Sequence, residues 1–172
     1  MGWKTFKQYF GIKHQVCVRN GRIIIGSPFV SDIASVDMNT GCVSCSQTFP
    51  DFLRKNYPSL ANADPAEILE CILAEDVFEK SVRIYVLEGH DVVEKFCEKP
   101  CYPNVTHDGV LIYDRDFFSV DRDVVVRAAR AYFDRRCESA AEIIEKRRAE
   151  IAEQERSIAE WKIARDKLSG VS

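Results

Sequence analysis

The C-terminal segment, residues 138–172, carries the pattern that most restricts how this chain can fold. From Ser139 onward it has seven basic and seven acidic residues, and Ile144, Ile151 and Ile158 recur at every seventh position. A seven-residue apolar repeat is typical of a helix that packs against another helix. A helix of about 30 residues is roughly 45 Å long and is not stable on helix propensity alone. It must therefore pack on its own domain, on a second copy or on another protein.

The apolar repeat predicts the surface through which the chain associates. Two rows of residues along the helix would form this surface, which we call the seam. The isoleucine row is regular, whereas Arg147 and Gln154 interrupt the neighbouring row. Because the charged faces are too numerous for a helix enclosed by a domain, we predict a partner-binding surface, with a homodimer as one outcome. The predicted partner-binding residues are Ile144, Ile151, Ile158, Trp161 and Leu168.

The continuity of this helix is left open by the sequence. Ser139 and Glu142 have the spacing of a capping box, which starts a helix, but the residues before them are also helical in pattern. We therefore predict one α+β domain over residues 1–137 and an amphipathic helical extension over residues 138–172.

The first third of the chain has the features of an antiparallel β-meander. Asn20-Gly21 is the residue pair that tight hairpin turns prefer, and it lies between two β-rich runs. Asn39, Thr40 and Gly41 form the turn of a second predicted hairpin.

The middle of the chain is predicted to be helical and then mixed. Asp64 and Pro65 have the N-cap and first-turn positions of a helix over residues 64–80. A strand is expected at 82–87, a short helix at 88–99 and a further strand at 109–114. The predicted fold class is therefore α+β: an N-terminal antiparallel β-meander, a helical middle, a short β-α-β segment and a long C-terminal helix.

Composition excludes some classes of function. The chain is 46% hydrophobic and 30% charged, as in a globular protein, and its net charge is −3. It lacks the strongly basic character of a nucleic-acid-binding domain, so nucleic acid is not expected as a partner. No signal peptide and no stretch long enough to cross a membrane is present, which predicts a cytoplasmic protein with no membrane partner.

Four of the seven cysteines are spaced as two close pairs. Cys42 and Cys45 form one pair, and Cys97 and Cys101 form the other. Two such pairs can supply the four thiolates of a structural zinc site. Residues i and i+3 of a strand point to opposite faces, however, and the first pair lies in a predicted strand. We therefore predict small core residues and no metal, with a zinc-stabilised nucleic-acid adaptor as an alternative.

A second group of residues resembles the Toprim catalytic domain. An apolar strand ends in Glu88, and a later apolar run leads to Asp114 and Asp116. In Toprim domains the corresponding carboxylates hold divalent metal for phosphoryl transfer. The resemblance, which covers about residues 82–118, implies a Mg²⁺-dependent nuclease or phosphoryl-transfer enzyme with these three catalytic residues. The segment between the motifs is shorter than in that family, and solvated turn residues are the other interpretation.

The N-terminal hairpins, residues 12–41, resemble small bacteriophage accessory proteins that open with an "IGSP"-like turn. This resemblance implies a protein of the bacterial host cytoplasm that binds and inhibits a host or defence protein. Our leading prediction is therefore a non-catalytic protein-binding protein, with no catalytic residue and no cofactor, whose partner is a bacterial protein.

Overall fold

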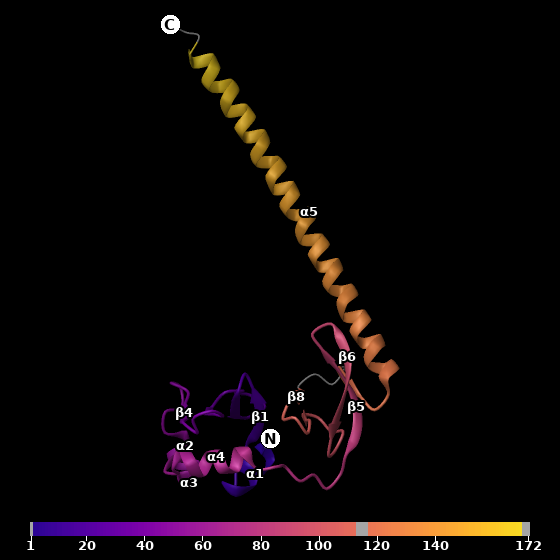
Figure 1. The fold of residues 1–172 in the computed structure, drawn as a ribbon. Coiled ribbons are helices and arrows are strands. Elements are labelled where there is room, and N and C mark those ends of the chain that lie inside the picture. The colour runs from indigo at the N-terminus through magenta and orange to yellow at the C-terminus, as the bar shows by residue number, and fades with distance from the viewer. Residues whose placement is uncertain (1, 113–116, 170–172) are drawn as a thin grey trace. The chain divides into compact units, whose positions relative to one another are not determined.

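The computed structural model describes residues 2–112 and 117–169. The chain divides into two compact units, Met1–Val126 and Arg127–Ser172, and each is described by itself. The first unit holds both hydrophobic cores and all the sheets, and the second is helical. The predicted α+β class is confirmed, with an N-terminal antiparallel meander and a long C-terminal helix (Figure 1).

The predicted meander forms a four-stranded antiparallel sheet in the order β1-β2-β3-β4. Its strands are β1 (Gln15–Arg19), β2 (Arg22–Gly26), β3 (Ala34–Asp37) and β4 (Val43–Cys45). Both predicted turns are present. Asn20 and Gly21 have φ values of 51° and 69°, which the two-residue turn between β1 and β2 requires.

A short helix, α1 (Trp3–Tyr9), precedes the meander and was not predicted. Trp3, Phe6 and Phe10 follow the three- and four-residue spacing of a helix face, and all three are buried in the first core. The carboxylate of Asp76 accepts hydrogen bonds from the backbone N–H groups of Lys4 and Thr5. The first N–H groups of α1 are therefore capped by a carboxylate more than 70 residues away in sequence. A local sequence pattern does not reveal such a cap.

Three helices cover the meander: α2 (Phe52–Asn56), α3 (Pro58–Ala61) and α4 (Pro65–Leu73). Asp64 caps α4 as predicted, because its side chain accepts a hydrogen bond from the N–H of Ala66 at 2.8 Å. The helix ends seven residues earlier than expected. Leu73 and Val77, which have the spacing of an apolar face in the longer helix expected over residues 64–80, are 78% and 81% exposed.

The predicted helix at 88–99 is wrong. That segment forms β6 (Asp91–Cys97), which pairs antiparallel with β5 (Val82–Glu88) along its full length. Gly89 has φ of 61°, as a tight hairpin turn requires. A two-residue turn therefore joins β5 directly to β6, and no crossover helix lies between them. The short β-α-β segment is therefore a hairpin, and β9 (Phe118–Ser119) completes a sheet in the order β6-β5-β9.

A small hairpin of β7 (Asn104–Val105) and β8 (Leu111–Ile112) lies beside this sheet. The strand expected at 109–114 is thus confirmed at two residues, and Asp114 lies outside the described residues. A second core, formed by Ile84, Val86, Cys97 and Ile112, packs here.

The last element, α5 (Arg122–Ser169), is one continuous helix of 48 residues that passes through Ser139 without interruption. Its first turn belongs to the first unit, where Val125 is fully buried. None of the described helices is both long and apolar enough to cross a membrane.

Candidate functional site

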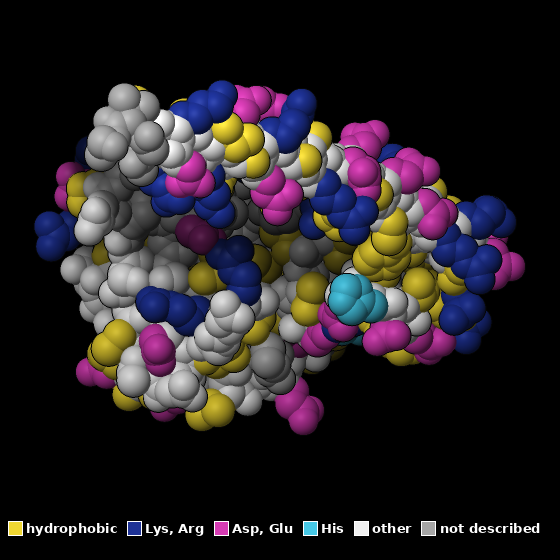
Figure 2. Space-filling view, turned by 90° about the horizontal axis from the view of Figure 1, so that it is seen from above, with side chains coloured by type: hydrophobic (Ala, Val, Ile, Leu, Met, Phe, Trp, Pro, Cys, Tyr) yellow, Lys and Arg dark blue, Asp and Glu magenta, His cyan; other side chains and the backbone are white. Residues whose placement is uncertain are grey.

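The second unit presents the predicted apolar seam along α5. From Asp134 to Leu168 every side chain is exposed except Ser157, which is partly exposed. Ile151 is 58% exposed and Trp161 is 66% exposed, fractions far above those of core residues. In Figure 2 apolar side chains appear among the basic and acidic ones along this helix. The exposed large apolar residues of this unit are Ile143, Ile144, Ile151, Ile158, Trp161, Ile163 and Leu168.

A heptad frame describes this seam. With Ile144, Ile151 and Ile158 at position a, position d is taken by residues 140, 147, 154, 161 and 168. Two of the d residues, Arg147 and Gln154, are polar, and Arg165 is a polar a residue. Ile163 lies on the opposite face, at position f, and does not contribute to the seam.

Ion pairs one turn apart support α5 as an isolated helix. Arg147 pairs with Glu150 at 2.6 Å, and Arg148 pairs with Glu145 at 2.7 Å. Pairs of this kind contribute only a few tenths of a kcal/mol each. They add a little to the stability of the helix, but they do not bury its apolar seam.

The Toprim-like residues lie as follows. Glu88 ends β5, and its carboxylate is 2.7 Å from the ammonium of Lys95 on β6. Asp114 and Asp116 lie outside the described residues. Among the residues that are described, no group of three or more His, Cys, Asp or Glu side chains is placed to hold a metal ion.

The prediction that the four paired cysteines are small core residues is wrong for Cys42 and Cys101, which are exposed. Cys42 precedes β4 and is exposed, whereas Cys45 lies within β4 and is half-buried. Cys97 ends β6 and is buried, and Cys101 is exposed in the next loop. Burial raises the pKa of the Cys97 thiol, which keeps it protonated at neutral pH.

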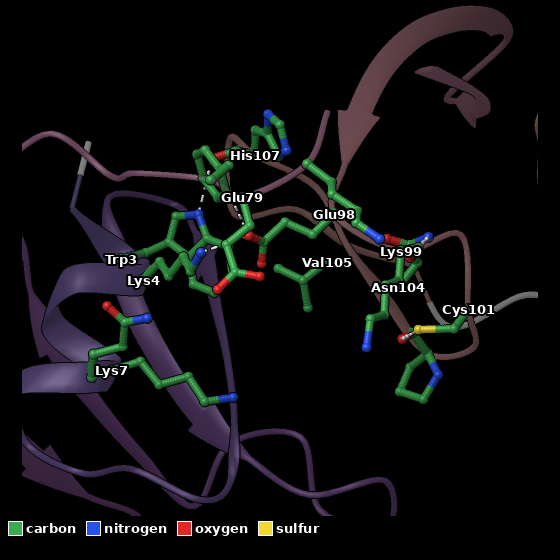
Figure 3. A pocket seen from close by; sticks show the side chains of 14 residues that line it. Trp3, Lys4, Lys7, Glu79, Glu98, Lys99, Cys101, Asn104, Val105 and His107 are labelled. Atoms are coloured by element: carbon green, nitrogen blue, oxygen red, sulfur yellow. Dashed lines mark hydrogen bonds and ion pairs between the residues drawn. The ribbon is translucent and has the colours of Figure 1, made fainter. Parts of the chain in front are cut away.

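A lysine-rich cleft in the first unit is the site that sequence reasoning missed. It has a volume of about 620 Å³ and is built from α1, the segment before β5, the loop after β6, and β7 with the loop that follows it (Figure 3). This volume is within the usual range for small-molecule sites. Its charged lining residues are Lys4, Lys7, Lys80, Lys99, Glu79 and Glu98.

One wall of the cleft is fixed by charged hydrogen bonds. Lys4 Nζ lies 2.6 Å from the carboxylate of Glu98 and donates to the carbonyl of Val77 at 2.8 Å. The same Glu98 carboxylate accepts from the backbone N–H of Glu79. The hydrogen bond from Lys4 holds the pKa of Glu98 below its usual value. Figure 3 shows Lys4 and Glu98 pointing toward one another.

Aromatic contacts fix the adjoining part of the cleft, where Lys4 Nζ lies 5.0 Å from the centroid of the Phe78 ring. Trp3 Nε1 donates to the carbonyl of His107 at 2.9 Å, and the His107 ring stacks on Phe78 with centroids 3.8 Å apart. These contacts join α1 to the loop after β7, so the cleft is formed by the fold itself.

No single motif predicts this cleft, because its residues come from four separate segments. The signal available in the sequence was the recurrence of lysine near aromatic residues, at Trp3-Lys4 and Phe78-Glu79-Lys80. Neither a family model, nor a curated protein, nor a solved structure matches this chain.

Proposed function

We propose that this is a non-catalytic protein-binding protein that associates through α5, by antiparallel pairing with α5 of a second copy. The observation that supports this most directly is the exposed seam between residues 137 and 168. An isoleucine side chain that becomes fully buried contributes about 1.5–3 kcal/mol. Ile144, Ile151 and Ile158 together are sufficient for a micromolar complex after the entropy of association is subtracted.

The polar interruptions of the seam favour an antiparallel partner. Consider the register in which Cys137 of one helix faces Leu168 of the other. In this register the residue numbers of any two facing seam residues add up to 305. Trp161 then packs on Ile144. Both Arg147 and Gln154 meet isoleucine, so the aliphatic part of each polar side chain covers an apolar neighbour.

The flanking charges favour the same register. Arg148 and Glu155 both occupy position e, and in this register Arg148 of each copy lies opposite Glu155 of the other. Residues at e and g set the partner and orientation of paired helices. The register therefore gives two symmetric attractive pairs and no like-charge pair at these positions.

Other arrangements bring like charges together. A parallel pair in register places Arg147 against Arg147, Arg165 against Arg165, and Glu150 against Glu155 of the second copy. An antiparallel pair shifted by seven residues places Arg148 against Arg148 or Glu155 against Glu155. Like charges at such positions are destabilising, so they disfavour these arrangements.

The partner of the whole chain is, in this proposal, a bacterial protein in the host cytoplasm. The support is the resemblance of the N-terminal hairpins to phage accessory proteins. A pull-down from bacterial lysate with the full chain as bait tests this part, and a defence or host protein recovered at constant stoichiometry is the expected result.

Light scattering coupled to size exclusion tests the association. The full chain is expected to elute as a dimer at tens of micromolar. Replacing Ile151 and Ile158 with aspartate puts charges into the seam and should give the monomer mass. The matched control places aspartate at Ala149 and Ile163, both at position f, and should remain dimeric. A wild-type chain that is monomeric at every concentration would refute self-association.

A further inference from the structure

The lysine-rich cleft carries more positive charge than its own carboxylates compensate. Lys4 is paired with Glu98, which leaves Lys7, Lys80 and Lys99 beside Glu79. Within the described part of the chain, the ammonium groups of these three lysines have no hydrogen-bonding or ion-pair partner. A concave surface with uncompensated charge of one sign concentrates ligands of the opposite sign.

Lys7 shows that the charge is built into the fold. It lies on α1 beside the buried face of that helix, and its side chain is half-buried. Burial without a carboxylate lowers the pKa of Lys7, because the charged form loses solvation. An anion placed against this ammonium would restore the lost interaction.

Asn104 adds a second observation that points to a ligand. It lines the cleft and is 1% exposed. Its Nδ2 donates to the carbonyl of Lys99 at 3.2 Å and contacts Cys97 Sγ at 3.5 Å. Its Oδ1 is buried and has no partner among the described residues. Buried polar atoms are rarely left unpaired, so this oxygen suits a ligand that donates a hydrogen bond.

We propose that the cleft binds a small phosphate monoester whose organic part carries hydroxyl or N–H donors. Lys7 and Lys99, which come from α1 and from the loop after β6, would bind the phosphate (Figure 3). Asn104 Oδ1 would accept from the organic part. This class of ligand follows from two features of the cleft: several lysines, which favour an anion, and one buried acceptor, which favours a hydrogen-bond donor.

The contiguous hollow along α1 leaves room for the organic part. It has a volume of about 360 Å³, shares Trp3, Lys4, Lys7 and Glu98 with the cleft, and extends to Ile12. None of the residues that line the cleft or this hollow belongs to α5, so substitutions in the α5 seam leave the lining intact.

Titration calorimetry of the full chain with three probes tests the site. Ribose 5-phosphate supplies both the dianion and hydroxyl donors, inorganic phosphate supplies only the anion, and ribose supplies only the donors. Ribose 5-phosphate is expected to bind about 10-fold or more tightly than inorganic phosphate, and ribose should show no measurable heat. Equal binding of the two phosphates would refute the role of Asn104, and binding of ribose alone would refute the anion site.

Two lysine variants locate the binding. Lys7→Gln and Lys99→Gln should each weaken ribose 5-phosphate binding by about 10-fold or more, because a charge-assisted hydrogen bond is lost. Lys13→Gln, an exposed lysine outside both hollows, is the matched control and should leave the affinity unchanged. No saturable binding by wild type, or equal affinities for wild type and both cleft variants, would overturn the proposal.

Discussion

The ammonium of Lys95 lies 2.6 Å from the carboxylate of Asp108, and this pair joins β6 to the loop between β7 and β8. The Lys95 side chain is only 15% exposed, and it also contacts Glu88 at 2.7 Å. Burial alone would lower the pKa of Lys95, but hydrogen bonds to Asp108 and Glu88 outweigh it and raise the pKa. The carboxylate of Glu88 is therefore already paired with Lys95. A metal ion that bound Glu88 would have to compete with this lysine.

The first prediction concerns the stability of this pair in acid. Burial would raise the pKa of Asp108, yet hydrogen bonds from Lys95 and Thr106 lower it below the ordinary value of 3.8. A carboxyl whose pKa is lower in the folded state contributes stability above its unfolded pKa and loses it as pH falls through the folded pKa. Asp108→Asn should therefore lower the melting temperature at pH 6, with a difference that disappears toward pH 2.

Thermal unfolding of wild type and Asp108→Asn between pH 2 and pH 7 measures this effect. The carboxylate is half exposed, so solvent screening limits the expected difference to about 1 kcal/mol. Asp51→Asn, an exposed aspartate with no side-chain ion pair among the described residues, is the control. A difference between wild type and Asp108→Asn that grows as pH falls would contradict the prediction.

The second prediction concerns Gly109, whose carbonyl accepts a hydrogen bond from the N–H of Val18. Its φ is 81°, and an added Cβ would lie 2.6 Å from Val18 Cγ2 and 3.1 Å from Trp3 Cδ1. Gly109→Ala should destabilise the protein by about 1–3 kcal/mol in urea unfolding. Gly11→Ala, which has φ of 60° and open space around it, isolates the backbone strain and should be milder. Equal effects would show that crowding is unimportant.

The third prediction concerns helix orientation and rests on the proposed pairing of α5. Arg148→Glu or Glu155→Arg alone should weaken the dimer about 10-fold, because each converts two attractive pairs into repulsive ones. The double exchange should restore wild-type affinity in sedimentation equilibrium. A parallel dimer would respond differently: Glu155→Arg alone would tighten it by removing the repulsion from Glu150.

The fourth prediction uses the exposed thiol of Cys137, which occupies position a of the seam. In the antiparallel pair Cys137 faces Leu168, so mild oxidation should not link two copies through Cys137. Leu168→Cys should give a dimer that is covalently linked on a non-reducing gel. Cys137→Ser in that background should abolish the link, and a Cys137-dependent link in wild type would indicate parallel helices.

Local sequence chemistry predicted the elements whose determinants lie close together in the chain. The Asn20-Gly21 turn supplies its own backbone geometry, and Asp64 caps its own helix. The α5 helix was predicted from its repeat and its charges. Its continuity through Ser139 was not, because a capping-box spacing occurs equally well inside a helix.

Elements that depend on distant contacts were missed or misassigned. Helix α1 is stabilised by Asp76 and by a core formed elsewhere in the chain. β6 contains Glu94 and Lys95, which are common in helices, but pairing with β5 and the tight turn at Gly89 determine its conformation. The cleft was missed for the same reason, since Lys7 and Asn104 meet only in the folded chain.

The continuity of α5 has a consequence for how a dimer would engage its partner. The segment from Arg122 to Ser169 contains neither proline nor glycine, so it has no sequence-encoded hinge. In the antiparallel register the two Arg127 residues would be separated along the paired helices by roughly 75 Å at 1.5 Å per residue. The pair would act as a stiff spacer between the first units of the two copies, on which the proposed bacterial partner would bind. Avidity would then be greatest for targets that repeat at that separation, and closely spaced sites would gain little from bivalency.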